Sequence, residues 1–398
     1  MNHLLLTYDF PPIGGGIARM MGELAKRYPA GALTVSTGSH PRSWEVDRAF
    51  PNRIDRVPTP SGRLRTVQGL LAWTRRAGTL AHSLGPRFIW CGNLKPAGYP
   101  ANWIHRRAGT PYGVMLYGTE LLLLRQRIGR SALKRRTARA LLGSASVLLT
   151  ISRATEDLCR QVLSELGFDR RGMDVRVVPL GTDPEHFRPG VDPAVVRSRY
   201  RLEGGRWLLT VARLAAHKGI DTGLLVLAML RDEYPDLRYA VVGSGIKQHE
   251  LEALAGKLGV AGRVRFLTGV PDEDLPGLYN HAELYLGVSR PAELMIEGFG
   301  ISLSEASACG LPVVGGLSGG IPDAVRDGET GLLVDAGRAE AVVDAVRLLL
   351  RDRELARRLG RAGRKAVEQF YNWDRVTADV VRIGEECAAG SLGRRVLR

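Results

Sequence analysis

Short apolar runs alternate with amphipathic segments along most of the chain. Such an alternation is typical of βαβ units and predicts parallel sheets flanked by helices. In the first half we expect strands at 3–8, 32–37, 87–91, 112–117, 146–151 and 175–178. In the second half we expect strands at 206–211, 238–242, 263–267, 283–288, 312–315 and 331–334, with helices such as 17–27, 221–233, 247–258, 302–309 and 339–351 between strands.

Each series of strands is long enough for one doubly wound domain. We therefore expect the α/β class, with two Rossmann-like domains that each contain a parallel sheet. A turn-rich stretch from Pro179 to Gly190 separates the two series. This stretch places a first domain at 1–182 and a second at 183–370.

The composition is that of a globular protein. Of 398 residues, 44% are hydrophobic and 24% are charged, which excludes disordered, collagen-like and coiled-coil chains. No run of about 18 apolar residues is present, so we expect no membrane-spanning helix. The apolar N-terminal run lacks the basic flank and cleavage site of a signal peptide. The four cysteines have no metal-type or disulfide-type spacing, so we expect a protein of the reducing cytoplasm.

The formal net charge of +15 belongs to the first half of the chain. Residues 1–180 contain 27 basic and 11 acidic residues, whereas 181–398 contain 29 basic and 30 acidic residues. This asymmetry predicts that the first domain meets a polyanion or an anionic surface.

The most basic segment runs from Arg125 to Arg139, with seven cations and no acid, and includes apolar positions such as Leu124 and Leu133. This pattern predicts a basic amphipathic helix that can lie on an anionic membrane. The protein would then associate peripherally with the inner face of the plasma membrane. A solvated basic helix face fits the pattern as well. Nucleic acid is not expected, because aromatic residues are sparse in the segment and no binding motif occurs.

Three glycines, Gly14 to Gly16, follow the first predicted strand and precede a helix. Their backbone N–H groups could approach an anion at the helix N-terminus. A simple turn that needs a positive φ explains them equally well. The G-x-G-x-x-G spacing and the Walker lysine are both missing, so the segment is not a P-loop.

Two cations, Arg213 and Lys218, follow the first strand of the second half. They lie at the carboxyl edge, where open α/β sheets bind ligands, and they suit the two phosphates of a diphosphate. Surface charges near a turn would give the same pattern. Farther on, Glu297 precedes a predicted helix that contains Glu305, with Gly-Phe-Gly between them. Such carboxylates can accept hydrogen bonds from sugar hydroxyls, or can simply cap the helix.

The remaining patterns in the sequence add no predicted site. The glycine-rich junction at 315–323 fits a flexible loop as well as a ligand site. The eight histidines show no zinc-type spacing, and no G-x-S-x-G elbow is present. We therefore expect neither a catalytic zinc nor a serine hydrolase, and no metal site is predicted.

Taken together and in this order, these residues resemble glycosyltransferase family 4, which comprises retaining enzymes of the GT-B fold. The segment from Glu297 to Glu305 is similar to the family's Glu-x7-Glu signature, and Arg213 with Lys218 is similar to its diphosphate-binding pair. Segments 241–245, 266–270, 309–314 and 327–332 are also similar, so the resemblance covers nearly the whole chain. The start, Asp9-Phe10-Pro11-Pro12 before the three glycines, resembles phosphatidylinositol mannosyltransferase-like members most.

The resemblance implies two domains that face each other across a cleft, the first for the acceptor and the second for the donor. It also implies a helix over about 371–398 that returns to the first domain. Arg213 and Lys218 would neutralise the leaving diphosphate, and Glu297 would bind the transferred sugar. The remaining implied donor contacts are Gly15, Gly16, Val270, Phe299, Gly300 and Ile301, through their main-chain groups, and Glu305, which would hold the ribose.

One segment departs from the family pattern. Members often carry histidine in a His-Gly-x-Asp/Glu segment near the donor sugar, whereas this chain has Tyr117-Gly118-Thr119-Glu120. Tyrosine can donate a hydrogen bond but carries no positive charge near neutral pH. The contact with the donor sugar is therefore expected to differ.

The implied activity is transfer of a hexosyl unit from a nucleoside diphosphate sugar, GDP-mannose or a UDP-sugar. The acceptor would be a hydroxyl of a lipid-linked or small molecule, with the anomeric configuration retained and no cofactor. A GT-B phosphorylase or a sugar-nucleotide epimerase would share this architecture. A basic module that only binds a membrane surface or nucleic acid is the alternative from a different class.

Overall fold

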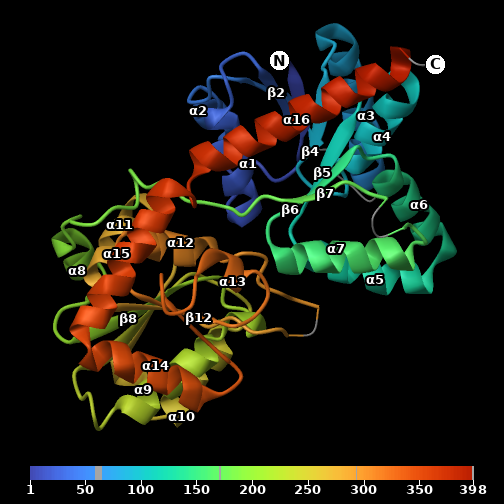
Figure 1. The fold of residues 1–398 in the computed structure, drawn as a ribbon. Coiled ribbons are helices and arrows are strands. Elements are labelled where there is room, and N and C mark those ends of the chain that lie inside the picture. The colour runs from blue at the N-terminus through green and yellow to red at the C-terminus, as the bar shows by residue number, and fades with distance from the viewer. Residues whose placement is uncertain (59–64, 170–171, 293, 397–398) are drawn as a thin grey trace. The chain divides into compact units, whose positions relative to one another are not determined.

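The computed structural model describes residues 1–58, 65–169, 172–292 and 294–396, and the chain divides into two compact units. The first unit comprises Met1–Val178 with Trp373–Arg398, and the second comprises Pro179–Asn372. The sequence placed the corresponding boundaries at 182 and about 370. Each unit is a parallel sheet covered by helices (Figure 1).

The sheet of the first unit has the strand order β3-β2-β1-β4-β5-β6-β7. Its strands are β1 (His3–Leu6), β2 (Leu33–Gly38), β3 (Arg53–Val57), β4 (Phe88–Cys91), β5 (Tyr112–Leu116), β6 (Val147–Thr150) and β7 (Val175–Val177). Its helices are α1 (Gly16–Arg27), α2 (Ser43–Asp47), α3 (Arg65–Leu84), α4 (Gly98–Ala108), α5 (Thr119–Arg130), α6 (Ala132–Gly143), α7 (Arg153–Glu165) and α16 (Trp373–Val396). From the boundary between β1 and β4, the chain order of the strands runs outward in both directions. The carboxyl ends of β1 and β4 are therefore the topological switch point.

The sheet of the second unit has the order β10-β9-β8-β11-β12-β13. Its strands are β8 (Arg206–Val211), β9 (Leu237–Val242), β10 (Val264–Leu267), β11 (Leu284–Gly287), β12 (Val313–Gly316) and β13 (Leu332–Val334). Its helices are α8 (Ala194–Arg199), α9 (Ile220–Leu230), α10 (Gln248–Lys257), α11 (Leu275–His281), α12 (Ile301–Ala308), α13 (Ile321–Ala324), α14 (Ala339–Arg351) and α15 (Arg353–Gln369). Three short 3-10 turns are η1 (Ala216–Lys218), η2 (Ala261–Arg263) and η3 (Asp272–Asp274). Here the switch point lies between β8 and β11.

The two parallel-sheet α/β units confirm the predicted fold class, and all the predicted strands are present. Strand β3 was not predicted; it is an edge strand whose buried face carries a carboxylate. Asp55 is only 7% exposed and pairs with Arg76 of α3. A buried charge at this position breaks the apolar alternation by which the other strands were recognised.

The basic segment is two helices, so the prediction of one helix over 125–139 is wrong. Helix α5 ends at Arg130 and α6 begins at Ala132. Between them, Ser131 is extended, with φ −152° and ψ 115°, and its Oγ accepts a hydrogen bond from the Lys134 N–H at 3.3 Å. Serine favours such an N-cap, which explains why the helix breaks there.

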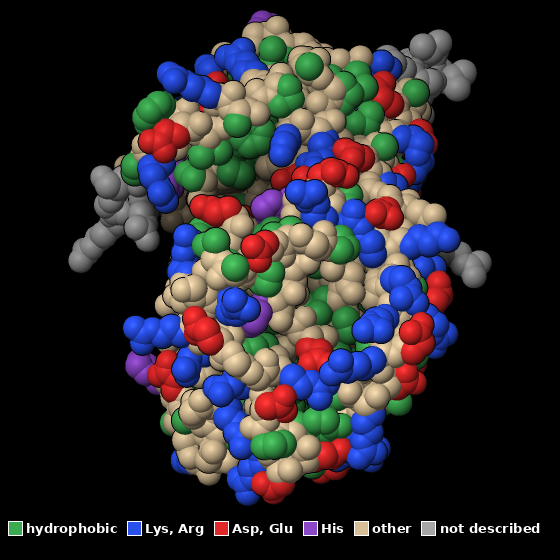
Figure 2. All heavy atoms as spheres, turned by 90° about the vertical axis from the view of Figure 1, so that its left-hand side faces the viewer, with side chains coloured by type: hydrophobic (Ala, Val, Ile, Leu, Met, Phe, Trp, Pro, Cys, Tyr) green, Lys and Arg blue, Asp and Glu red, His purple; other side chains and the backbone are tan. Residues whose placement is uncertain are grey.

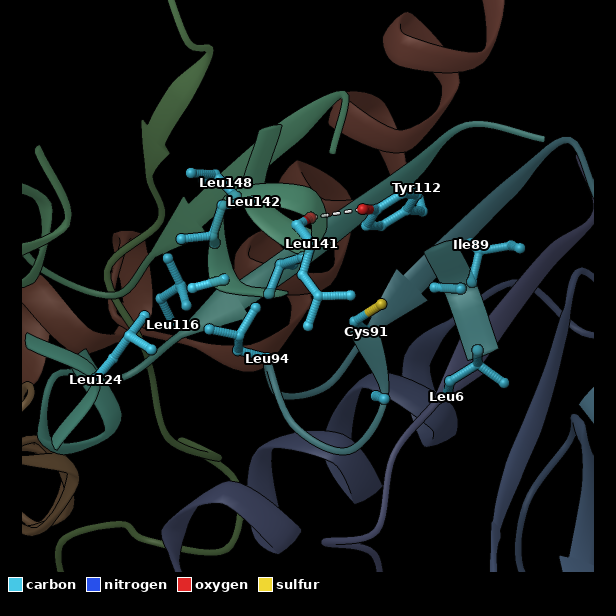
Figure 3. Packing of buried hydrophobic residues seen from close by; sticks show 14 of the residues in the cluster. Leu6, Ile89, Cys91, Leu94, Tyr112, Leu116, Leu124, Leu141, Leu142 and Leu148 are labelled. Carbon is cyan, nitrogen blue, oxygen red and sulfur yellow. Dashed lines mark hydrogen bonds between the residues drawn. The ribbon is translucent and has the colours of Figure 1, made fainter. Parts of the chain in front are cut away.

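The core of the first unit packs leucines from β5, β6, α5 and α6 around the loop after β4 (Figure 3). Tyr112 is fully buried, and its hydroxyl donates to the Leu141 carbonyl at 2.5 Å. Each fully buried leucine contributes about 1.5–3 kcal/mol through removal from water. The core therefore fixes the β4–α4 loop against α5, at the sheet edge where ligands bind.

Helix α16 returns to the first unit and packs on α1 and β4 (Figure 1). His3 Nε2 lies 3.0 Å from Glu385 Oε1, and Arg87 Nη1 lies 3.0 Å from Glu385 Oε2. No helix in the described part of the chain is long and apolar enough to cross a bilayer. On the face drawn in Figure 2, basic and acidic side chains are interspersed over the surface of the second unit, in keeping with its nearly balanced charge.

Candidate active site

The switch point of the second unit brings the loops after β8 and β11 together. Arg213 and Lys218 lie in the loop after β8, and Glu297 lies in the loop after β11. The loops touch at Gly219, which has a φ of +67° and whose Cβ, if present, would lie 2.0 Å from the Val288 carbonyl oxygen. Only glycine fits at this position, so the contact fixes one loop against the other.

Lys218 and Glu297 form an ion pair, with Nζ 2.6 Å from Oε2. Both side chains are largely buried, 16% and 17% exposed. Ser289 Oγ also donates to Glu297 Oε2, at 3.1 Å. Burial by itself would raise the pKa of Glu297, but the charge and hydrogen bond of Lys218, together with the hydrogen bond of Ser289, lower it. The site therefore holds an ionised carboxylate close to a cation.

The backbone of Glu297 is held by the glycine-rich junction after β12. Gly320 N–H donates to the Glu297 carbonyl at 2.9 Å. A Cβ on Gly319, which has a φ of +57°, would lie 2.3 Å from the same carbonyl oxygen. The junction at 315–323, which the sequence left open between loop and ligand site, thus positions the carboxylate.

Between Arg213 and Lys218, the loop after β8 carries a buried histidine, His217. Arg213 is exposed, and among the described residues its side chain has no hydrogen bond or ion pair. His217 is only 2% exposed, and its pKa is lowered to about 4, first by burial and then by the charge of Lys218, with a further contribution from Arg213. Its carbonyl accepts a hydrogen bond from Arg290 N–H at 2.9 Å. A neutral His217 leaves Arg213 and Lys218 as the cations of this loop.

Helix α12 begins directly after the Gly-Phe-Gly segment. Gly300 has a φ of +99° and precedes the first turn, which carries no acidic residue. The Phe299 side chain is 1% exposed, so only its main chain is available to a ligand, and Ile301 is half-buried. The positive N-terminal end of α12 favours an anion beside Glu297.

Glu305 lies on the following turn of α12 and is 3% exposed. Its Oε2 accepts a hydrogen bond from the Tyr279 hydroxyl at 2.7 Å. Val270 is half-buried in the loop after β10, next to Gly269 with its φ of +67°. Glu305 and Val270 both belong to the second unit and follow the carboxyl ends of its strands, Glu305 on α12 and Val270 in the loop after β10.

Gly15 and Gly16 belong to the first unit, after β1 and therefore at its own switch point. Gly15 has a φ of +120° and precedes α1. A Cβ on Gly15 would meet no atom within 4 Å, so this glycine is required by its backbone conformation and not by crowding.

Tyr117 directs its hydroxyl to the protein backbone. It donates to the Gly92 carbonyl at 2.6 Å, and its N–H donates to Glu120 Oε1 at 2.5 Å. Burial raises the pKa of Glu120 despite hydrogen bonds from backbone N–H groups. The Tyr117 hydroxyl is therefore used inside the unit.

Ser289 and Asn93 were not identified from the sequence, and Asp9 was named only as part of the N-terminal segment. Ser289 lies on the β11 loop beside Glu297, and Asn93 Nδ2 donates to Asp9 Oδ2 at 3.0 Å across the switch point of the first unit. All three follow strands at a switch-point edge. The rule that ligands bind at this edge is the signal that could have identified them.

The described residues contain no group of three His, Cys, Asp or Glu side chains that could hold a metal ion. Asp272 and Asp274 have the spacing of a metal-binding Asp-x-Asp pair. However, Asp274 accepts hydrogen bonds from Arg199 Nη1 at 2.6 Å and from the Tyr200 hydroxyl at 2.5 Å.

Comparison with known proteins identifies the family. Residues 15–165 match the glycosyl transferase 4-like domain, and residues 196–366 match the glycosyl transferases group 1. A protein of Mycolicibacterium smegmatis is 32% identical over 377 residues, which cover 93% of this chain and 94% of that protein. The chain belongs to the group 1 glycosyl transferases. It is thus a glycosyltransferase, which confirms the predicted enzyme class.

The relatives of this glycosyltransferase carry specific names. The M. smegmatis protein and one from Mycobacterium tuberculosis are named GDP-mannose-dependent alpha-(1-6)-phosphatidylinositol monomannoside mannosyltransferases. The latter is 31% identical over 389 residues, 94% of this chain and 96% of the relative. A D-inositol 3-phosphate glycosyltransferase of Corynebacterium jeikeium is 36% identical over 240 residues, 58% of this chain and 56% of the relative.

Solved structures confirm the GT-B fold. Anabaena HepE, solved in complex with UDP and glucose, has a TM-score of 0.77 at 19% identity, with 96% of this chain and 99% of that chain covered. Sucrose-phosphate synthase from Thermosynechococcus elongatus has a TM-score of 0.78 at 20% identity, with 98% and 100% covered. At these identities the likeness concerns the fold alone.

Proposed function

We propose that this glycosyltransferase transfers a mannosyl group from GDP-mannose to a hydroxyl of an inositol-containing acceptor, with retention of the anomeric configuration. The observation that carries the proposal is the Lys218–Glu297 ion pair at the switch point of the second unit, with Arg213 on the same loop as Lys218. The choice of donor and acceptor is supported by two relatives that match nearly the whole chain and are named for GDP-mannose and phosphatidylinositol monomannoside.

The departing diphosphate would be stabilised by Arg213, Lys218 and the N-terminal end of α12. In a site of low dielectric, preorganised positive groups aimed at developing negative charge lower the barrier without reorganising. Arg213 is exposed and has no partner among the described residues, so its guanidinium is available to a phosphate. Lys218 would divide its charge between the phosphate and Glu297. No metal ion is needed in this scheme.

Glu297 would hold the transferred sugar. Its carboxylate is ionised and is fixed by Lys218 and Ser289 at the side chain and by Gly320 at the backbone. A fixed carboxylate accepts hydrogen bonds from sugar hydroxyls with little loss of entropy. Glu305 on α12 would accept from the ribose.

In the proposed reaction, the bond between the anomeric carbon and the phosphate oxygen breaks, and a bond to the acceptor oxygen forms on the same face. The proton of the acceptor hydroxyl passes to the departing phosphate oxygen. GDP and the new mannoside are the products, so atoms and charge balance without a further reactant.

The acceptor would be reached at a membrane surface through the basic segment Arg125–Arg139. On α5 and α6, the side chains of five exposed cations have no partner among the described residues, and Leu133 is 75% exposed. These cations are Arg127, Arg130, Lys134, Arg135 and Arg136. Clustered cations around an exposed apolar side chain favour anionic lipid. We therefore propose peripheral association with the inner, cytoplasmic face of the plasma membrane, and no nucleic-acid partner.

A donor screen tests the proposed activity. The intact protein is mixed with GDP-mannose, UDP-glucose or ADP-glucose and with phosphatidylinositol monomannoside. The masses of the products are then measured by mass spectrometry. We expect a gain of one hexose with GDP-mannose and the largest thermal shift with the same donor, because the tightest ligand stabilises most at equal concentration. Transfer from a UDP-sugar alone, or sugar release that requires inorganic phosphate, would contradict the proposal.

Liposome flotation tests the membrane contact. Vesicles with and without anionic lipid are compared, and we expect binding to the anionic vesicles that weakens as salt increases. The charge-reversal variant Arg135→Glu/Arg136→Glu should float less. Equal binding of the unaltered protein to neutral and anionic vesicles would contradict this contact.

A further inference from the structure

Two buried tyrosines bond the same face of α12. Tyr279 of α11 donates through its hydroxyl to Glu305 Oε2 at 2.7 Å, and Tyr285 of β11 donates to Ser302 Oγ at 2.7 Å. Ser302 and Glu305 are three residues apart on the helix, so their side chains project from one face. The ring centroids of the two tyrosines are 5.8 Å apart. The two hydroxyls therefore hold neighbouring positions of α12, but only one of them holds a carboxylate.

The hydroxyl of Tyr279 is fixed in place by the packing of its ring. The ring is fully buried and meets Phe187 edge to face, with centroids 5.7 Å apart, while Tyr285 packs against it as well. The next residue, Asn280, ties α11 to the chain beside Phe187, because its Nδ2 donates to the Arg188 carbonyl at 2.9 Å. A ring enclosed in this way has little rotamer freedom. The hydroxyl thus defines where the carboxylate on α12 can lie.

Glu305 differs from Glu297 in how its charge is held. Glu297 is paired with the cation of Lys218, whereas the hydroxyl that bonds Glu305 belongs to a neutral phenol. Burial, and then the charge of Glu305, raise the pKa of Tyr279, so the phenol keeps its proton and remains the donor. Such a donor orients a carboxylate without cancelling its negative charge. It also uses only one of the roughly four lone-pair positions that a carboxylate offers to donors.

We propose that Tyr279 is a positioning residue for the nucleoside of the donor, because it sets the Glu305 carboxylate to accept hydrogen bonds from the ribose hydroxyls. This inference rests on the proposed function, which assigns the ribose to Glu305. Tyr279 itself does not touch the donor, since its side chain is fully buried. The preference of the enzyme for ribonucleotides over nucleotides without ribose hydroxyls therefore depends on a hydroxyl that lies outside the ligand's reach.

Nucleotide binding to the intact protein tests this role. Calorimetric titrations compare GDP with 2′,3′-dideoxy-GDP, and UDP with its dideoxy form, so that the ribose is probed whichever base the protein prefers. In the unaltered protein we expect the dideoxy nucleotide to have a Kd about tenfold or more above that of the ribonucleotide, because the analogue leaves a placed carboxylate unpaired.

The variant Tyr279→Phe removes one oxygen atom and keeps the ring. We expect it to raise the Kd of the ribonucleotide and to leave that of the dideoxy nucleotide unchanged, so that their ratio falls to about threefold or less. Glu305→Asp keeps the charge but withdraws the carboxylate from Tyr279, and it should lower the ratio in the same way. Adding Tyr279→Phe to Glu305→Asp should lower the ratio no further, since the tyrosine acts through the carboxylate.

Tyr285→Phe is the matched control. It removes the hydroxyl of the neighbouring tyrosine, whose bond goes to Ser302 and not to Glu305. The ratio of the two Kd values should therefore stay at that of the unaltered protein, whatever the change in melting temperature. This ratio separates positioning from a general loss of stability, which would weaken both nucleotides alike.

Three results would overturn the positioning role. These are an unchanged ratio in Tyr279→Phe, an equal weakening of both nucleotides in that variant, and a ratio near one in the unaltered protein. If Tyr279→Phe does not fold, the ratio in Glu305→Asp decides in its place. Transfer from GDP-mannose to phosphatidylinositol monomannoside is measured with the same preparations. No transfer by the unaltered protein overturns the proposed function, whereas intact transfer with an unchanged ratio in Tyr279→Phe overturns this inference alone.

Discussion

At the residue scale, the site depends on a carboxylate that stays ionised although it is largely buried. Glu297 is 17% exposed, and its pKa is lowered because Lys218, 2.6 Å away, more than offsets burial. Removing one member of such a pair leaves the other charge buried without compensation. The pair is therefore both a structural contact and a part of the proposed chemistry, and the two roles need separate tests.

Substitution of Arg213 tests the chemical role separately from the structural one. Its side chain is exposed and has no partner in the described parts of the chain, so its loss should not affect stability. We expect Arg213→Ala to lower kcat/KM about 100-fold, the usual effect of removing one group that stabilises a developing anion. The melting temperature should be unchanged. Arg358→Ala, at an exposed position of α15, is the matched control and should retain full activity.

A double-mutant cycle on Lys218 and Glu297 isolates the structural role. Lys218→Met and Glu297→Gln should each lower the free energy of unfolding by about 2 kcal/mol, since each leaves one charge of a largely buried pair uncompensated. The double variant should lose clearly less than the sum of both. Urea unfolding of the four proteins checks this, and strictly additive losses would show that the pair is not coupled.

His217 predicts a pH dependence of stability. Its pKa is about 4 in the folded protein against 6.5 in the unfolded chain, so the unfolded state binds more protons between these values. Stability should fall as pH drops from 6.5 towards 4, by about 3 kcal/mol. In His217→Gln this part of the slope should vanish, while other histidines such as His3 remain in both proteins. Parallel stability curves from urea unfolding at pH 4 to 7 would contradict the assignment.

Single residues were predictable where they follow strands at a switch point. Arg213, Lys218 and Glu297 were named from their positions after strands and in glycine-rich loops; the structure pairs Lys218 with Glu297 and places Arg213 on the same loop as Lys218, while their roles stay a prediction. Ser289 and Gly320 were not named, because their roles depend on contacts between loops that are distant in sequence. The hydrogen bond from the Tyr117 hydroxyl to the Gly92 carbonyl was not predicted, because it joins two segments that are distant in sequence.

At the scale of elements, the two site loops depend on their contact at Gly219. Gly219 and Gly204 both have a φ of +67°, but only at Gly219 would a Cβ meet an atom, the Val288 carbonyl oxygen at 2.0 Å. The two glycines therefore separate backbone strain from steric exclusion.

We expect Gly204→Ala to lower the free energy of unfolding by about 1 kcal/mol through strain alone, with activity unchanged. Gly219→Ala should destabilise further and also reduce kcat/KM at least tenfold, because it pushes the Lys218 loop away from the Glu297 loop. Urea unfolding and steady-state kinetics measure both effects. Full activity in Gly219→Ala would show that the loops need no such contact.

Elements were predictable from apolar periodicity, and the failures have physical causes. Twelve strands carry apolar runs, whereas β3 places Asp55 on its buried face and is stabilised by Arg76 instead. The break between α5 and α6 is local, since Ser131 caps α6 within a segment whose overall pattern is helical. Side-chain pairing and capping of this kind are weak signals in a single sequence.

At the scale of the whole molecule, the charge asymmetry agrees with the division into two units. The balanced second unit carries Arg213, Lys218 and Glu297, and the basic first unit carries α5 and α6 with their exposed cations. In our account, the excess positive charge meets the membrane that holds the acceptor, while the donor's diphosphate is matched by a few fixed groups. Domain number and fold class followed from the sequence because two complete strand series are present.

The most direct test of the central claim is proton NMR of the complete reaction with GDP-α-mannose and phosphatidylinositol monomannoside, in buffer without inorganic phosphate. We predict a new α-mannoside signal that grows in step with GDP release, is retained with Arg358→Ala and is reduced about 100-fold with Arg213→Ala. A β-mannoside product, donor consumption without a new glycoside, or equal rates with and without Arg213 would contradict the account.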